Sequence, residues 1–190
     1  MSKTLLIFDC FGVITSEIAP IWFASRYPDD EAKKLKEEYF AGADRGEKSI
    51  GELVTRLSEG LNIPKNEIIE DWKKIFTVNY ELIELISELK KSCYIALLSN
   101  APQGLVESII DKYEFGNLFD KVFISSHYKM AKPDRDFYRL CLDSFDDADN
   151  FYMIDDNTKN LDGLSELKIK THLFKTNDLL KDYFRKEGLL

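Results

Sequence analysis

The chain has 190 residues, of which 44% are hydrophobic and 32% are charged, and its formal net charge is -8. This length and composition fit a globular protein that buries one core, with room for one insertion. The acidic balance argues against a general nucleic-acid-binding protein, which needs a basic surface. We therefore expect no nucleic-acid partner.

The apolar runs of the sequence predict neither a membrane span nor a signal peptide. No apolar run approaches the roughly 18 residues of a membrane span, and the run before Asp9 is too short for a signal peptide. The three cysteines are an odd number and lack metal-type spacing. We expect them to be reduced structural thiols, which suits a cytosolic protein. We expect a cytoplasmic protein with no membrane partner.

The first predicted element is a buried strand at residues 4–9, and the next strand begins only at residue 94. Most of the sequence between them has helical patterns, at residues 29–40, 49–62 and 64–76. Ser49 and Glu52 have the spacing of a capping box. We predict a small all-helical cap at residues 16–78, inserted after the first strand, and a core made of residues 1–15 and 79–190.

Four more short apolar runs follow, and they lack the alternation of a half-exposed strand. They occupy residues 94–99, 121–126, 151–156 and 171–174. Continuous apolar runs are typical of strands that are covered on both faces. Helical patterns at residues 104–113 and 136–145 separate some of them. This alternation predicts an α/β protein with a three-layer, Rossmann-like parallel sheet.

Polar residues stand at or just beyond the carboxyl ends of these strands, where open parallel sheets bind their ligands. They are Asp9, Ser99, Asn100, Lys132, Asp155 and Asp156. Each one alone is explained by a helix cap, a turn or a solvated side chain. Their collection at one edge of one predicted sheet favours a site.

Together these groups suit phosphoryl transfer through a covalent aspartate. A phosphate monoester repels a carboxylate such as Asp9, and a bridging Mg²⁺ ion removes this repulsion. Asp156 offers the ion a second carboxylate. Ser99 and Lys132 can hold the phosphate oxygens, and the lysine offsets charge on the transferring group.

The same residues resemble the four motifs of the haloacid dehalogenase superfamily, a group dominated by phosphatases. The motifs are FDCFGVIT, LLSNA, AKPDRDFY and MIDDNTKN, and the resemblance spans residues 5 to 160. A helical insertion after the first strand matches the small cap of that family. The resemblance implies a Mg²⁺ cofactor and a small phosphorylated substrate, and it leaves open whether the protein is a monomer or a homodimer.

The resemblance also implies roles for single residues. Asp9 is the nucleophile and a metal ligand, together with the backbone carbonyl of Phe11 and the carboxylate of Asp156. Asp155 and Asn160 support these ligands.

On the substrate side, the resemblance implies that Ser99 binds the phosphate and that Lys132 stabilises it. Asn100 and Phe11 are expected to contact the substrate. Arg45 lies in a polar turn, DRGEKS, that some related caps direct toward the site, although a solvated turn explains it equally well.

Position 11 departs from the pattern, because phosphatases of this family carry a second aspartate there. That aspartate protonates the leaving oxygen and later activates water, and Phe11 can do neither. A slow or compensated phosphatase is one interpretation. A 2-haloacid dehalogenase, which needs no metal and has an aromatic residue at this position, is a second, although the acidic pair Asp155 and Asp156 argues against it. A binding or regulatory protein is a third.

Two histidines are candidates to replace the missing acid. His127 and His172 are isolated in the sequence, with no partner at ligand spacing. His127 follows the third strand and is the better candidate. Packing or surface roles are the simpler interpretation of both.

Overall fold

Five parallel strands form one sheet at the centre of the computed structural model, which describes residues 3–190. The strand order is β3-β2-β1-β4-β5. The strands are β1 (Lys3–Phe8), β2 (Cys93–Ser99), β3 (Lys121–Ile124), β4 (Ala148–Asp155) and β5 (Ile169–Leu173). All five were predicted, and the parallel α/β fold is confirmed. The third strand is shorter than predicted because Ser125 already begins a helical turn, α7 (Ser125–Tyr128).

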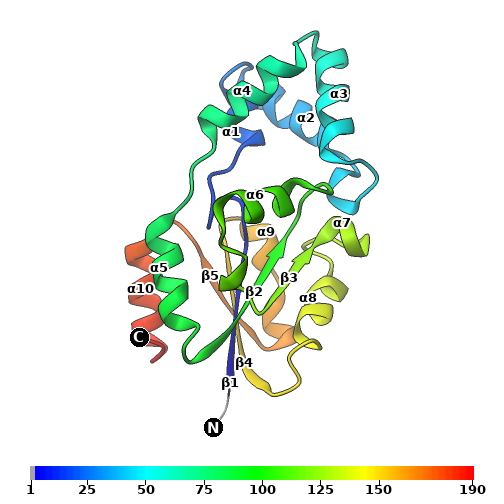
Figure 1. The fold of residues 1–190 in the computed structure, drawn as a ribbon. Coiled ribbons are helices and arrows are strands. Elements are labelled where there is room, and N and C mark those ends of the chain that lie inside the picture. Colours follow the sequence, from blue (N-terminus) through cyan, green and yellow to red (C-terminus); the bar gives the residue numbers. More distant parts are fainter. Residues whose placement is uncertain (1–2) are drawn as a thin grey trace.

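Helices cover both faces of this sheet (Figure 1). Side chains alternate between the faces of a strand, so Leu6 and Phe8 pack with one apolar cluster, and Leu5 and Ile7 with another. The first cluster includes α5 (Tyr80–Leu89), α6 (Leu105–Tyr113) and α10 (Asn177–Lys186). The second includes α8 (Arg135–Leu142) and η3 (Leu164–Leu167). Burial on both faces explains why the strands read as continuous apolar runs.

The segment between β1 and α5 forms a separate group of helices above the carboxyl end of the sheet (Figure 1). It contains α1 (Ala19–Ala24), α2 (Asp29–Phe40), η1 (Ala43–Arg45), α3 (Ile50–Leu61) and α4 (Lys65–Ile75). We call residues 16–78 the helical insert. Its own apolar cluster surrounds Trp22 and Phe23, both fully buried. These aromatic side chains pack inside the insert.

Local sequence signals explain where the insert helices begin. The Ser49 side chain accepts the backbone N–H of Glu52, and the Glu52 carboxylate accepts the backbone N–H of Ser49 at 2.7 Å. The predicted capping box therefore starts α3. Pro64 lies one residue before the first residue of α4 and fixes the backbone at its entrance.

The insert is attached to the core at two places. On one side, the Ser16 N–H donates to the Thr77 carbonyl at 3.0 Å, and the Thr77 N–H donates to Ser16 Oγ at 2.9 Å. On the other side, the Ile50 N–H donates to the Gln103 carbonyl at 3.2 Å. Gly46 also approaches the backbone of Ser126 so closely that a Cβ atom would lie 2.4 Å from its carbonyl oxygen. These contacts hold the insert over the carboxyl end of the sheet.

The remaining short elements are η2 (Gly116–Leu118) and α9 (Thr158–Leu161). Within residues 3–190, none of the helices combines the length and the apolar character that a membrane crossing demands.

Candidate active site

Asp9 lies at the carboxyl end of β1, the central strand. Its N–H donates to the Ile154 carbonyl at 3.0 Å, which fixes the backbone against β4. Its carboxylate accepts the Cys10 N–H at 2.7 Å and lies 2.9 Å from Lys132 Nζ. Burial raises the pKa of Asp9, and the charge of Lys132 opposes this change. Asp9 as a whole is 7% exposed, and it lines a cavity. Its carboxylate is therefore held in place but accessible from the cavity.

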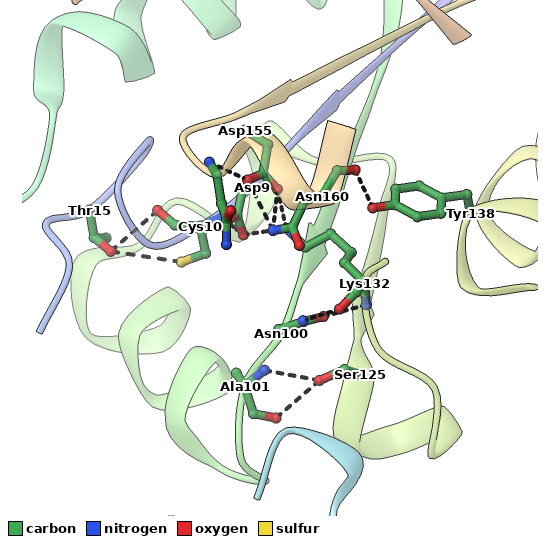
Figure 2. Close-up of polar contacts among 11 residues, drawn as sticks. Asp9, Cys10, Thr15, Asn100, Ala101, Ser125, Lys132, Tyr138, Asp155 and Asn160 are labelled. Carbon is green, nitrogen blue, oxygen red and sulfur yellow. Dashed lines mark hydrogen bonds and ion pairs between the residues drawn. The ribbon is translucent and has the colours of Figure 1, made fainter. Parts of the chain in front are cut away.

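Lys132 is buried between two carboxylates, as Figure 2 shows. Its Nζ atom lies 2.9 Å from Asp9 Oδ1 and 2.6 Å from Asp155 Oδ2. Burial disfavours the ammonium, but the two carboxylates outweigh burial, and the pKa of Lys132 is raised. The Asn100 side chain fixes the backbone of Lys132, accepting its N–H and donating to its carbonyl, both at 2.8 Å. A charged ammonium is therefore held beside the Asp9 carboxylate.

Asp155 is fully buried and bonded on every side. Besides Lys132, it accepts the Asn160 amide at 3.0 and 3.1 Å and the Asn157 N–H at 2.9 Å. Tyr138 in turn donates its hydroxyl to the Asn160 carbonyl at 2.5 Å (Figure 2). Asp155 and Asn160 thus support the site by positioning Lys132.

Asp156 differs from its neighbour because its carboxylate lines the cavity. It lies against the backbone of Gly12, and a Cβ atom at Gly12 would be 2.1 Å from Asp156 Oδ2. Gly12 has φ +78°, a conformation that favours glycine. Burial raises the pKa of Asp156, and the charge of Asp155 raises it further. The role of Gly12 was not predicted from the sequence, where the only signal is a glycine directly after Phe11.

The three aspartates could hold a hard cation. One carboxylate oxygen from each of Asp9, Asp155 and Asp156 lies within 4.8 Å of the other two. Oxygen donors of this kind suit Mg²⁺, and the burial that disfavours their charges is relieved by a cation. The donor set therefore fits the expected ion.

Ser99 ends β2 and is fully buried, and its hydroxyl has no hydrogen-bond partner among the described residues. A buried hydroxyl without a partner costs about 1–3 kcal/mol. The loop that follows is fixed, because the Ala101 N–H donates to Ser125 Oγ at 2.9 Å (Figure 2). The neighbouring Asn100 lines the cavity. The Ser99 hydroxyl is therefore left to bond a further group, although Ser99 itself is not among the described residues that line the cavity.

Phe11 forms part of the cavity wall. Its ring packs against both the core cluster that contains Leu6 and the insert cluster that contains Trp22. The phenyl group therefore joins the insert to the core at the position where the family pattern has an acid.

The cavity between sheet and insert has a volume of about 510 Å³. Both the core side and the insert side carry polar and apolar groups. The core contributes Asp9, Asn100, Lys132, Asp156 and Asn160, and the insert contributes Glu17, Ile18, Lys36, Glu37, Phe40, Asp44 and Trp72, among others. This size and lining suit a small molecule with a polar head.

The charged residues that the insert contributes to the cavity were not predicted from the sequence. Lys36 and Glu37 lie in a helix of mostly charged residues, where no pattern separates a cavity side from a solvated side. Glu17 and Asp44 stand outside the predicted helices. Only the folded insert shows which of these side chains face the cavity.

Other candidates named from the sequence have partners elsewhere. Arg45 Nη1 lies 2.8 Å from Asp134, is half exposed, and is not among the described residues that line the cavity. The neighbouring Asp44 lines it instead. His127 Nε2 lies 2.6 Å from Glu107, and the His172 ring stacks on Tyr183. Neither histidine is part of the cavity lining described here.

Known proteins show the same fold. An enzyme of the haloacid dehalogenase family from Bacteroides thetaiotaomicron, solved with magnesium and inorganic phosphate, superposes with a TM-score of 0.71 at 20% identity, over 93% of this chain and 96% of that one. The L-2-haloacid dehalogenase of Xanthobacter autotrophicus superposes with a TM-score of 0.61 at 15% identity, over 90% of this chain and 76% of that one. At these identities the likeness shows the fold alone.

Sequence comparisons extend this likeness. Drimenol cyclase drtB from Aspergillus calidoustus is 33% identical over 82 residues, which are 43% of this chain and only 16% of that protein. The family model for haloacid dehalogenase-like hydrolases matches residues 3–167. This match covers most of the chain, including all six polar residues named at the strand ends, and the chain therefore belongs to the haloacid dehalogenase-like hydrolase family.

Proposed function

We propose that the protein is a Mg²⁺-dependent phosphatase that hydrolyses a small phosphate monoester through a phospho-aspartate at Asp9. The observation that carries this proposal is the charge arrangement at the tips of β1 and β4. One carboxylate oxygen from each of Asp9, Asp155 and Asp156 lies within 4.8 Å of the other two, and Lys132 is paired with Asp9 and Asp155. Such a site needs a cation before it can accept an anionic substrate.

The size of the repulsion supports the need for a cation. Two like charges about 4 Å apart repel by about 4 kcal/mol at an effective dielectric constant of about 20. A bound Mg²⁺ ion, held by Asp9, Asp156 and the Phe11 carbonyl, would neutralise carboxylate and phosphate charge. Asp155 is already paired with Lys132 and bonded to Asn160, so Asp156 is the carboxylate left for the metal.

The residues of the chain then have separate tasks. The Asp9 carboxylate attacks phosphorus, and the ester bond to the leaving oxygen breaks. Lys132 offsets charge on the transferring group, and the orphaned Ser99 hydroxyl donates to a phosphate oxygen. Water then cleaves the acyl phosphate and restores Asp9. The complex of the Bacteroides enzyme with magnesium and phosphate agrees with this choice of chemistry.

A dehalogenase is the second candidate, and Phe11 favours it. The cavity wall at position 11 is aromatic, and an L-2-haloacid dehalogenase shares the fold. In that reaction Asp9 displaces a halide, which leaves without a proton. Two adjacent aspartates beside an anionic substrate argue against it. That reaction would also use an arginine of the insert to hold the halide or the substrate carboxylate, and Arg26 is instead paired with Glu67 at 2.9 Å and with Asp71.

A paired assay separates these candidates. Phosphate release from a panel of monoesters, including p-nitrophenyl phosphate, is measured with Mg²⁺ and with EDTA, and halide release is measured from L-2-chloropropionate. Release of phosphate only with Mg²⁺, lost in Asp9→Asn, is the expected result. Halide release that EDTA does not change would establish the dehalogenase. No release in either assay would favour a binding or regulatory protein.

A further inference from the structure

The backbone after Asp9 turns back toward the cavity. The Thr15 N–H donates to the Cys10 carbonyl at 2.8 Å, and the Gly12 N–H donates to the Thr15 carbonyl at 2.7 Å. Ser16 is then fixed by its hydroxyl, which donates to the Ile75 carbonyl at 2.9 Å. The position of the next residue, Glu17, is therefore determined by hydrogen bonds on its N-terminal side.

Glu17 lines the same cavity as Asp9 and Phe11. It is partly buried, and within residues 3–190 its carboxyl group forms no hydrogen bond or ion pair of its own. A carboxyl group that is neither paired nor fully solvated is free to exchange a proton with a ligand. Glu17 thus offers a carboxyl group from the segment after β1, the same segment in which position 11 lacks the expected aspartate.

The other two carboxyl groups on the insert side have different surroundings. Burial raises the pKa of Asp44, and the charges of Lys36, Lys132 and Arg45 oppose this rise. Burial also raises the pKa of Glu17, where Lys36 and Lys132 oppose the rise but Asp156 and Asp155 add to it. Glu37 lies on α2, farther along the chain. Glu17 therefore has the surroundings that an acid needs near an anionic site.

We infer that Glu17 is a catalytic residue that protonates the leaving oxygen and later accepts a proton from water, in place of the acid absent at position 11. This inference rests on the proposed phosphatase function. As the Asp9–phosphorus bond forms and the ester P–O bond breaks, the Glu17 proton moves to the leaving oxygen and an alcohol departs. Water then attacks phosphorus and gives a proton to Glu17, while the Asp9–phosphorus bond breaks and inorganic phosphate is released.

Electrostatic effects at Glu17 agree with this role. Burial raises the pKa of Glu17, and the negative charge of Asp156 raises it further. Lys36 and Lys132 lower the pKa, and Asp155 raises it. The balance of these groups holds the pKa above the ordinary value for a glutamate, which keeps the proton available closer to neutral pH.

The dependence on the leaving group tests this role. An alkyl alcohol leaves only with a proton, whereas p-nitrophenolate leaves without one. For Glu17→Gln we expect kcat/KM for an alkyl phosphate to fall by about 10²–10⁴-fold, while kcat/KM for p-nitrophenyl phosphate changes by less than about 10-fold. We also expect a burst of p-nitrophenolate, because loss of the base slows hydrolysis of the phospho-aspartate.

Matched variants keep the test decisive. Glu37→Gln removes a carboxyl group from the same cavity, and it should change both esters by the same factor. Glu17→Asp should retain part of the alkyl phosphatase activity, and thermal unfolding of each variant reports its folding. Equal losses on both esters in Glu17→Gln, with no burst, would overturn the inference. Absence of Mg²⁺-dependent phosphate release from the wild-type protein would instead overturn the proposed function, and the role of Glu17 with it.

Discussion

The Asp156 carboxylate occupies the space that a side chain on Gly12 would need. An ideal Cβ atom at Gly12 would lie 2.1 Å from Asp156 Oδ2 and 2.4 Å from its carboxyl carbon. One motif thus supplies the acid and another supplies the gap for it. Residue 12 must therefore lack a side chain for the Asp156 carboxylate to take its place in the cation site.

Gly12→Ala should therefore weaken Mg²⁺ binding as well as stability. The new methyl group displaces Asp156, and the positive φ of residue 12 costs about 1–2 kcal/mol for a non-glycine residue. Calorimetric Mg²⁺ titration should show at least a 10-fold loss of affinity. Gly51→Ala is the control, because a Cβ atom there meets no atom within 4 Å, and its position in α3 favours alanine. Unchanged Mg²⁺ affinity in Gly12→Ala would remove Asp156 as a metal ligand.

Asp9→Asn should abolish phosphate release and preserve the fold. The pKa of folded Asp9 is raised above its ordinary value, chiefly by burial. Stability of the metal-free protein therefore falls as pH rises from the ordinary aspartate value of about 3.9 toward this raised pKa. Asparagine does not ionise, so the variant does not lose this stability as pH rises. Near pH 7 in EDTA the variant should therefore unfold at a higher temperature than the wild type.

The pH series checks the sign of this effect. The difference in unfolding temperature should shrink as the pH approaches about 4, where unfolded aspartates become protonated. A variant that is less stable than the wild type throughout this range would show that the ion pair with Lys132 outweighs burial.

Lys132→Met should lower the stability of the protein, in contrast to Asp9→Asn. The substitution removes the ammonium that lies 2.9 Å from Asp9 and 2.6 Å from Asp155 and leaves both buried carboxylates without it. Breaking a buried ion pair on one side typically costs about 3–5 kcal/mol. Denaturant unfolding measures this change, and the double variant Lys132→Met/Asp155→Asn should recover part of it. No recovery would mean that Asp155 does not depend on Lys132 for its charge.

Much of this architecture follows from local sequence patterns. Each strand is a short apolar run, and the capping box at Ser49 marks the start of α3. Because parallel strands end at one edge, Asp9 and Lys132 could be expected together from the order of the motifs alone. The structure brings them to 2.9 Å.

The insert side of the cavity could not be predicted in this way. Whether Glu17 or Arg45 faces the cavity depends on the turn after Asp9 and on the two attachments of the insert, and these are long-range contacts. In a short turn such as DRGEKS, neighbouring side chains point in different directions, so the adjacent residue Asp44 lines the cavity while Arg45 pairs with Asp134. No periodicity in the sequence distinguishes these two outcomes.

Arg45→Ala should consequently have little effect on catalysis. The guanidinium is half exposed and paired with Asp134, and such surface pairs contribute about 0–1 kcal/mol. We expect kcat/KM for phosphate monoesters to change by less than about 3-fold. Asp44→Asn is the comparison, because Asp44 lines the cavity. A large rise in KM for Arg45→Ala would restore the substrate-binding role expected from the sequence.

Phe11→Asp tests whether position 11 and Glu17 provide the same chemistry. The ring of Phe11 packs against both apolar clusters, so its removal should cost about 1.5–3 kcal/mol of stability. In the Glu17→Gln background, however, the new carboxyl group stands where the family pattern has its acid. We expect the double variant to regain at least 10-fold in kcat/KM for an alkyl phosphate over Glu17→Gln alone, with little change for p-nitrophenyl phosphate. Phe11→Asn/Glu17→Gln is the matched control, since the amide loses the same packing but cannot donate a carboxylic proton. Equal rates for the two double variants would show that position 11 no longer reaches the leaving oxygen, because the insert has adapted to the phenyl ring.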